Sequence, residues 1–215
     1  MLAVTFALPN ESSGFVRLLG GRHEKLTVFH TGVGEKVCRA RIEPFLDSQR
    51  FDLLISSGFA GGADPSLGVG DLFLAENFSA PKLLADAKAL LLSRVGRLLT
   101  APRVIQTESA RAQLAREQGA AAVDMETEWI ARACAERELP MLSLRVISDT
   151  ATAPFPAPAE VLFDLERQQT NARVLAGYLL AHPAGLVRLV RFARQIKLAR
   201  ECLAGALTTL LRSFD

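Results

Sequence analysis

The sequence predicts an α/β fold with a largely parallel or mixed sheet. Short β-prone runs alternate with stretches of helical character, which is typical of strands that are connected by helices. The run Phe51–Ser56 (FDLLIS) is apolar almost throughout, as expected for a strand that is covered on both faces. No internal repeat or long linker divides the 215 residues, so we expect residues 1–215 to form a single domain.

The strands are predicted from short apolar runs bounded by turn residues. Pro9-Asn10 closes the first run, and Gly20-Gly21 opens the second. In chain order the predicted strands are Leu2–Leu8, Leu26–His30, Phe51–Ser56, Gly70–Ala75, Arg103–Thr107, Ala120–Val123 and Met141–Ile147. Residues Gly58–Gly62, with three glycines among five residues, are predicted as a loop.

The helices are predicted from apolar periodicity and from breakers. In chain order they run from after Gly34 to about Leu46, over Glu108–Gln118, Met125–Glu138 and Ala159–Ala181, and over about 184–211. Pro140 ends the third of these helices, and His182-Pro183 separates the last two. Ala80–Leu99 is ambiguous and helical only in part.

Composition and charge exclude several classes of protein. With 49% hydrophobic and 22% charged residues, the chain is not expected to be disordered. The net charge of +2 gives no reason to expect a nucleic acid as partner. Six basic and two acidic residues lie in 184–215, so the last helix is basic while the rest of the chain is slightly acidic.

Cysteine and histidine usage argues against metals and disulfides. Cys38, Cys134 and Cys202 are far apart and odd in number, and the three histidines are equally scattered, so we expect no metal site and no cofactor. The apolar segment Met1–Pro9 lacks a basic head and fits a strand better than a signal sequence. No apolar run is long enough to span a membrane. A reduced, cytoplasmic protein is the expectation.

Polar residues follow several predicted strands, and ligands of such sheets bind beyond the carboxyl ends of the strands. The residues in question are Asn10 and Glu11, Thr31–Gly34, Ser57–Gly62, Asp124–Glu126, and Ser148 with Asp149. Carboxylates without a metal cluster indicate acid–base chemistry and recognition of hydroxyl groups.

Taken singly, these motifs have simpler explanations. Gly32-Val33-Gly34 lacks a third glycine at Val37, which favours a tight turn over a dinucleotide-binding fingerprint. Asp124 is suited to cap the helix that follows it, with Glu126 in the first turn. Ser148-Asp149-Thr150 also fits an Asx turn.

Taken together and in order, the motifs resemble the purine nucleoside phosphorylase and nucleosidase superfamily, and most of all its methylthioadenosine/S-adenosylhomocysteine nucleosidases. The matching segments are Ala7–Glu11, Thr31–Gly34, Ser57–Gly62 leading to Val69-Gly70-Asp71, Val123–Glu126 and Arg145–Asp149. The resemblance implies a three-layer α/β/α fold with a central mixed, largely parallel twisted sheet. It also implies a homodimer and cleavage of the N-glycosidic bond of a purine nucleoside, with adenine as the expected base.

The resemblance assigns roles by position. Asp149 corresponds to the general acid that protonates the leaving purine, and Glu11 to the base that activates water. Glu126 corresponds to the acceptor of the ribose hydroxyls, and Met125 to a residue that packs on the sugar. The remaining predicted substrate-binding residues are Phe59, Ala60, Gly61 and Ser148.

Departures from the family pattern bear on acceptor and base. The phosphate-binding arginines of phosphorolytic members are missing from Leu8–Glu11 and Ile55–Gly58, which favours hydrolysis, although Arg103 or Arg145 are alternatives from elsewhere and phosphate stays the alternative co-substrate. Phe59 replaces a small hydroxyl residue, and the segment before Glu108 lacks the aromatic residue that commonly stacks on the base.

The basic C-terminal helix suggests a second resemblance, to hopanoid-associated phosphorylases. In a helical projection its apolar residues share one face: Leu186, Leu189, Phe192, Ala193, Ile196, Leu203, Leu207 and Leu210. Packing on the sheet or on a partner subunit is favoured over peripheral membrane contact. The alternatives to a nucleosidase are therefore a phosphorylase of lipid-linked adenosine and a non-catalytic nucleoside-binding protein.

Overall fold

The computed structural model describes residues 1–21, 25–150, 152–153, 155–182 and 184–213. The strands are β1 (Leu2–Phe6), β2 (Leu26–His30), β3 (Leu53–Gly62), β4 (Leu72–Ala75), β5 (Arg94–Thr100), β6 (Ala120–Asp124) and β7 (Met141–Asp149). The helices are α1 (Pro9–Leu19), α2 (Glu35–Asp47), α3 (Pro81–Leu90), α4 (Glu108–Gln118), α5 (Thr127–Ala135), α6 (Ala159–Leu162), α7 (Ala172–Ala181) and α8 (Ala184–Leu211). A short 3-10 helix, η1, covers Glu76–Phe78.

The strands form one mixed sheet in the order β2-β1-β3-β6-β5-β4-β7, and β3 also pairs with β7. The β3–β7 pairing joins the two ends of the run from β3 to β7, so five strands close on themselves. The pairs β3–β6 and β4–β7 are antiparallel, whereas β1–β2, β1–β3, β3–β7, β4–β5 and β5–β6 are parallel. The predicted mixed, largely parallel sheet is confirmed.

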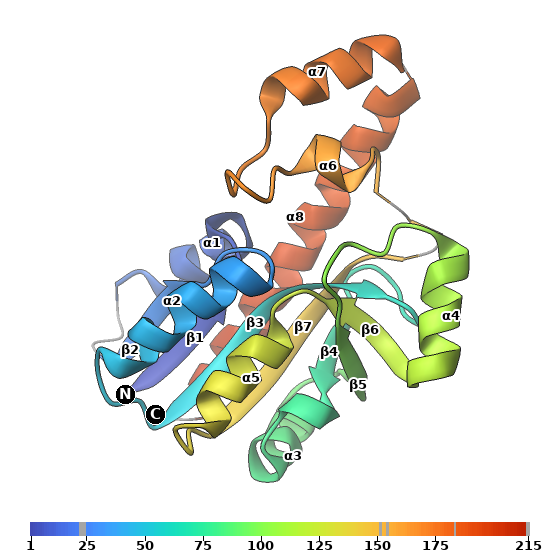
Figure 1. Ribbon diagram of the computed structural model, residues 1–215. Coiled ribbons are helices and arrows are strands. Elements are labelled where there is room, and N and C mark those ends of the chain that lie inside the picture. Colours follow the sequence, from blue (N-terminus) through green and yellow to red (C-terminus); the bar gives the residue numbers. More distant parts are fainter. Residues whose placement is uncertain (22–24, 151, 154, 183, 214–215) are drawn as a thin grey trace.

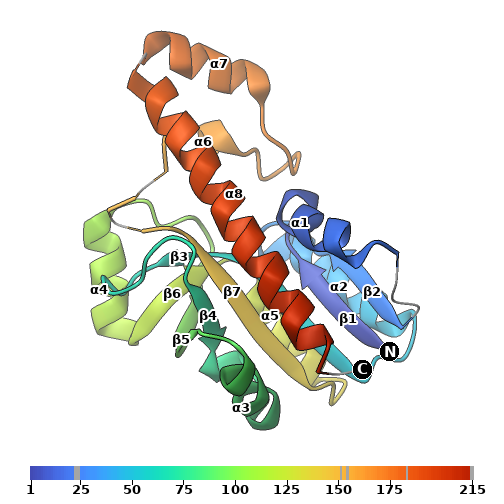
Figure 2. The same ribbon diagram turned by 180° about the vertical axis from the view of Figure 1, so that it is seen from behind.

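Helices cover both faces of the sheet (Figures 1 and 2). On one face, α1 and α8 pack through Phe15, Leu203 and Leu207 against β1, β3 and β7. On the other, α2 and α5 pack through residues such as Ile42 and Ile130. The three-layer α/β/α arrangement is thereby confirmed, while the assignment of residues 1–215 to a single domain stays a prediction.

The predicted strand at Arg103–Thr107 is wrong. The strand lies earlier, at β5, inside the stretch that the sequence left ambiguous, and it pairs with β4 and β6. Val104 and Ile105 give the later segment its strand-like pattern, but their side chains line a cavity instead of a sheet.

Three further boundaries differ from the sequence prediction. The glycine-rich segment Gly58–Gly62 is not a loop but the end of β3, paired with β7. A helix, α1, begins at Pro9, directly after the first strand, and no helix was predicted there. The long helix expected over Ala159–Ala181 is interrupted, because residues 163–171 form a loop before Asn171 caps α7 by accepting hydrogen bonds from the N–H groups of Arg173 and Val174.

The C-terminal helix has the predicted bounds, but its apolar face is used in two ways. Its second half is buried on the sheet through Leu203, Leu207 and Leu210. Its first half projects past the edge of the sheet together with α7 (Figure 2), and Leu186 is 56% exposed. Packing on the sheet therefore holds for the second half of the helix, whereas packing of the first half on a partner subunit stays a prediction. Among the described residues no helix combines the length and apolarity needed to cross a membrane.

Candidate active site

A cavity of about 830 Å³ lies where the loops after β1 and β2, the end of β3, the β6–α5 junction and the end of β7 converge. The first half of α8, α6 and residues 103–106 complete its walls. All eight predicted site residues line this cavity: Glu11, Phe59, Ala60, Gly61, Met125, Glu126, Ser148 and Asp149. Residues separated by up to 138 positions in the chain are thus gathered around one space.

Glu11 is held at the start of α1 by backbone donors. Its Oε2 accepts hydrogen bonds from the N–H groups of Ala7 at 2.9 Å and Leu8 at 3.2 Å, and its Oε1 accepts from Phe59 N–H at 3.4 Å. Gly58 permits this approach, because a Cβ atom at that position would lie 3.2 Å from Glu11 Oε2. Burial raises the pKa of Glu11, and these backbone hydrogen bonds, together with the charge of Arg145, oppose the rise.

Glu126 is positioned by the loop that follows β2. Its Oε1 accepts a hydrogen bond of 2.8 Å from the N–H of Gly34, whose φ of +84° favours glycine. Burial raises the pKa of Glu126 to about 8, and the negative charge of Asp124 adds to the rise. A carboxyl group in this state both donates and accepts hydrogen bonds near neutral pH.

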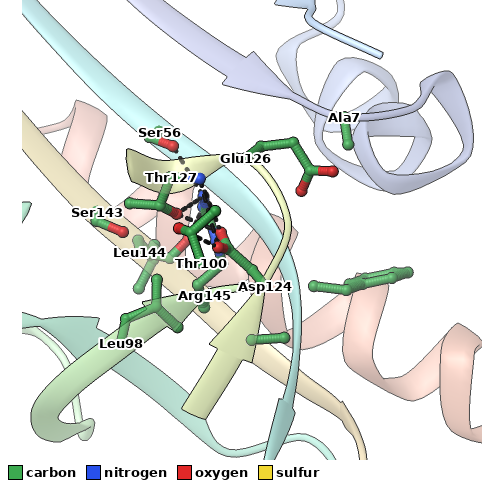
Figure 3. Close-up of polar contacts among 12 residues, drawn as sticks. Ala7, Ser56, Leu98, Thr100, Asp124, Glu126, Thr127, Ser143, Leu144 and Arg145 are labelled. Carbon is green, nitrogen blue, oxygen red and sulfur yellow. Dashed lines mark hydrogen bonds and ion pairs between the residues drawn. The ribbon is translucent and has the colours of Figure 1, made fainter. Parts of the chain in front are cut away.

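Asp124 lines the cavity and also has a structural role, through the polar contacts drawn in Figure 3. It accepts hydrogen bonds from Thr100 Oγ1 at 2.9 Å and from Thr127 N–H, and it forms a buried ion pair with Arg145 Nε at 3.0 Å. Arg145 also donates to Ser56 Oγ at 2.9 Å. Asp124 therefore links β6, the start of α5 and β7, as the capping interpretation predicted in part. Arg145, bound in this cluster, is not free to hold phosphate.

Asp149, at the end of β7, is almost completely buried. Its Oδ1 accepts a 2.7 Å hydrogen bond from Ser148 Oγ, and its Oδ2 forms an ion pair with Nη2 of Arg111. Burial raises the pKa of Asp149, while the Arg111 guanidinium and the Ser148 hydroxyl oppose that rise. The side chain is thus a buried carboxyl group next to the Arg111 guanidinium.

Aromatic side chains form part of the cavity wall. Phe155 and Phe192 lie with their ring centroids 5.4 Å apart, and Phe163 and Phe59 also line the cavity. The stacking aromatic that the segment before Glu108 lacks is thus available from the region between β7 and α8. Such a wall suits a planar base or an apolar substituent.

The loop between α6 and α7 fastens onto the loop after β2. Gln168 Oε1 accepts a 2.7 Å hydrogen bond from Val33 N–H, and Gln168 Nε2 donates to Val33 O at 3.1 Å. Because Gly34 follows Val33 directly, this contact also fixes the donor that holds Glu126.

Two residues of the site were missed by the sequence analysis. Arg111 lies on α4, whose sequence is rich in polar residues. Gln168 has the αL backbone conformation, with a φ of +54°, in a segment that was predicted to be helical. Neither has a local sequence signal, because each acts on a part of the chain that is distant in sequence. Among the residues that the structure describes, no group of three or more histidine, cysteine or acidic residues is placed to hold a metal ion.

The fold is that of nucleoside phosphorylase- or nucleosidase-like proteins. Residues 76–182 match the family model described as Phosphorylase superfamily. The resemblance to the purine nucleoside phosphorylase and nucleosidase superfamily is thereby confirmed.

Two curated relatives are similar in sequence. A futalosine hydrolase of Streptomyces coelicolor is 32% identical, over 48% of this chain and 56% of the relative, so the match spans little more than half of that protein. A 5'-methylthioadenosine/S-adenosylhomocysteine nucleosidase of Tolumonas auensis is 24% identical, over 68% of this chain and 77% of the relative.

Two solved structures share the fold. The futalosine hydrolase of Helicobacter pylori superposes with a TM-score of 0.73 at 16% identity, over 99% of this chain and 97% of that one. The 5'-methylthioadenosine/S-adenosyl homocysteine nucleosidase of Campylobacter jejuni gives 0.71 at 17% identity, over 99% and 98%.

Proposed function

We propose that this protein cleaves the N-glycosidic bond of a purine nucleoside and that water is the acceptor. The observation that carries the proposal is the gathering of Glu11, Glu126 and Asp149 around one cavity, each with a pKa raised by burial. Nucleosidase names among the relatives support the same reaction class. The resemblance to methylthioadenosine nucleosidases favours adenine, although the base is chosen by the residues that contact its edge.

The proposed reaction assigns one step to each carboxyl group. Asp149 gives a proton to a ring nitrogen of the purine as the bond to C1′ breaks and its electron pair leaves with the base. Arg111 stabilises the carboxylate that remains on Asp149. The raised pKa of Asp149 suits a group that must carry a proton near neutral pH.

The other two groups act on the sugar and the acceptor. Glu126 accepts hydrogen bonds from the ribose hydroxyls, with Met125 packed on the sugar. Glu11 accepts the proton of the attacking water as the water oxygen bonds to C1′. The raised pKa of Glu11 makes it a stronger base than an exposed glutamate. No cofactor takes part in the proposed reaction.

The test is release of free base from adenosine, inosine and 5'-methylthioadenosine by the purified chain. Asp149→Asn is expected to lower kcat by roughly 10²- to 10⁴-fold, because the amide cannot supply the proton. The matched control is Asp86→Asn, which changes an exposed aspartate on α3 and is expected to leave turnover unchanged. Absence of base release from every nucleoside, or equal rates for wild type and Asp149→Asn, would contradict the proposal.

Assays with and without phosphate distinguish water from phosphate as the acceptor of the sugar. Arg103 lines the cavity and is exposed, whereas Arg145 is bound to Asp124. We expect the same rate with and without phosphate, and free sugar as the product. Formation of a sugar 1-phosphate would show that the reaction is phosphorolysis and not hydrolysis. That result would favour the alternative of a phosphorylase that acts on lipid-linked adenosine. Tight nucleoside binding without turnover would favour the non-catalytic binding protein.

We further propose that the chain acts as a cytoplasmic homodimer. The support is the exposed apolar surface on the first half of α8, which includes Leu186, Val187 and Val190. The basic side chains Arg188, Arg191 and Arg194 lie on the same half of the helix, so peripheral contact with an anionic membrane is the competing use of this surface.

A further inference from the structure

Arg111 is a buried cation directly beside the proposed general acid. It projects from the first turns of α4, and only 4% of it is exposed. A Cβ atom on Gly61 would lie 2.9 Å from its Nη1, so β3 carries glycine where the guanidinium passes. Arg111 and Asp149 both line the cavity. This arrangement places a donor-only group at the part of the cavity where the base is expected.

The Arg111 guanidinium donates hydrogen bonds to four acceptor atoms around it. Its Nε donates to Ile105 O at 3.0 Å, and its Nη1 donates to Gly62 O at 3.1 Å and to Asp149 O at 3.4 Å. Its Nη2 donates to Asp149 Oδ2. Four of the five N–H groups are thus engaged, and among the described residues the second N–H of Nη2 has no acceptor.

6-Oxopurines and 6-aminopurines differ in the exocyclic group on C6, which lies beside N7 on the edge of the base. A 6-oxopurine presents two adjacent acceptors, N7 and O6, whereas a 6-aminopurine presents an acceptor at N7 and a donor at N6. Arginine pairs with the first pattern because it only donates, and asparagine or glutamine pairs with the second. An exocyclic amine at this place meets the N–H groups of Arg111, which cannot accept a hydrogen bond from it.

We propose that Arg111 selects the base, so that the site takes a 6-oxopurine nucleoside such as an inosine- or guanosine-type substrate in preference to a 6-aminopurine nucleoside. The inference rests on the proposed function and specifies its substrate class. It departs from the adenine that the family resemblance favours. When the glycosidic bond breaks, the electron pair that leaves with a 6-oxopurine is shared with O6, and the Arg111 cation stabilises that charge while Asp149 protonates N7.

The test compares kcat/KM for inosine and adenosine, which share the ribose and its 5'-hydroxyl and differ only in the base. Wild type is expected to favour inosine by roughly 10- to 100-fold. Arg111→Gln offers a carbonyl acceptor together with amide donors, and it is expected to shift the ratio toward adenosine. Arg116→Gln, an exposed position on the same helix, is the matched control and is expected to keep the wild-type ratio. A purely structural role of Arg111 would lower both rates and leave their ratio unchanged.

Calorimetric binding of the free bases hypoxanthine and adenine gives a second readout that needs no turnover. Tighter binding of hypoxanthine by wild type, lost in Arg111→Gln, supports the assignment even where that variant is less stable. Equal or tighter binding of adenine by wild type overturns it. Base release with a ratio that Arg111→Gln does not change overturns this inference alone, whereas base preference in binding without any nucleoside cleavage overturns the proposed reaction and leaves the role of Arg111 standing.

Discussion

At the scale of single residues, the three carboxyl groups of the site differ in their hydrogen-bond and ion-pair partners. Glu11 is held by three backbone N–H groups, Glu126 by one, and Asp149 by a hydroxyl and a guanidinium. Because every group is removed from water, each pKa is raised, yet each keeps distinct partners. Residue type and order along the chain were enough to predict these three positions. Arg111 could not be predicted, because its ion pair spans 38 positions and depends on how α4 packs.

Glu126 makes the stability of the protein depend on pH. Its pKa is about 8 in the folded chain and near 4.5 when exposed, so the folded state binds the proton more tightly. The favourable contribution is fully present below pH 4.5 and is lost as the pH rises through about 8. Glu126→Gln keeps an acceptor for Gly34 N–H and removes this titration, so the stability of wild type relative to the variant is expected to fall by on the order of 3 kcal/mol over that range.

The measurement is urea unfolding of wild type and Glu126→Gln at pH 5 and pH 8.5. Asp124, Glu11 and Arg145 face Glu126 and are present in both proteins, so the comparison isolates the Glu126 carboxyl group. Parallel pH profiles for the two proteins would show that the Glu126 carboxyl group is not perturbed by burial.

At the scale of elements, the sequence predicted a strand correctly where the local pattern decides its conformation. It failed where a tertiary contact decides the conformation. The strands β2 and β7 were predicted almost to the residue, because apolar runs and neighbouring breakers define them. Gly58–Gly62 continues β3 through pairing with β7, which overrides the preference of glycine for loops. Val104 and Ile105 face the cavity, which accounts for their apolar character. The sequence pattern alone does not distinguish apolar residues that line a cavity from those of a strand.

The contact between the α6–α7 loop and the β2–α2 loop is expected to control substrate affinity. Gln168→Ala removes both hydrogen bonds to Val33 and frees the neighbouring Gly34 N–H that positions Glu126. We expect KM for the nucleoside to rise by roughly 10-fold while kcat changes less, since Asp149 on β7 is not touched.

Steady-state kinetics with Gln169→Ala as control tests this expectation. Gln169 is exposed and joins the loop through its backbone in the bridge with Asp164, so its side chain is dispensable. A fall in kcat at constant KM, or the same effect from both variants, would show that the loop contact does not hold Glu126 in place for the substrate.

At the scale of the whole molecule, the excess positive charge and the exposed apolar surface meet on the first half of α8. The second half of the helix belongs to the main core, whereas the first half rises beyond the sheet with α7 (Figures 1 and 2). Phe192 and Ile196 turn toward the cavity, and Val187 and Val190 remain 67% and 47% exposed. A helical projection finds an apolar stripe but does not show where the underlying sheet ends, so it could not show which part of the stripe, Leu186 included, stays exposed.

The exposed stripe is the surface on which we expect a second copy of this chain to pack. Val187→Glu combined with Val190→Glu places two charges in that contact, so the double variant is expected to sediment as a monomer where wild type sediments as a dimer. Leu92→Glu introduces a charge at a fully exposed leucine next to α3 and is expected to leave the dimer intact. Because neither valine lines the cavity, base release in the variant reports whether the partner contributes to the site. A wild-type monomer that binds vesicles of anionic lipid, and loses that binding in the double variant, would assign the same stripe to a membrane surface instead.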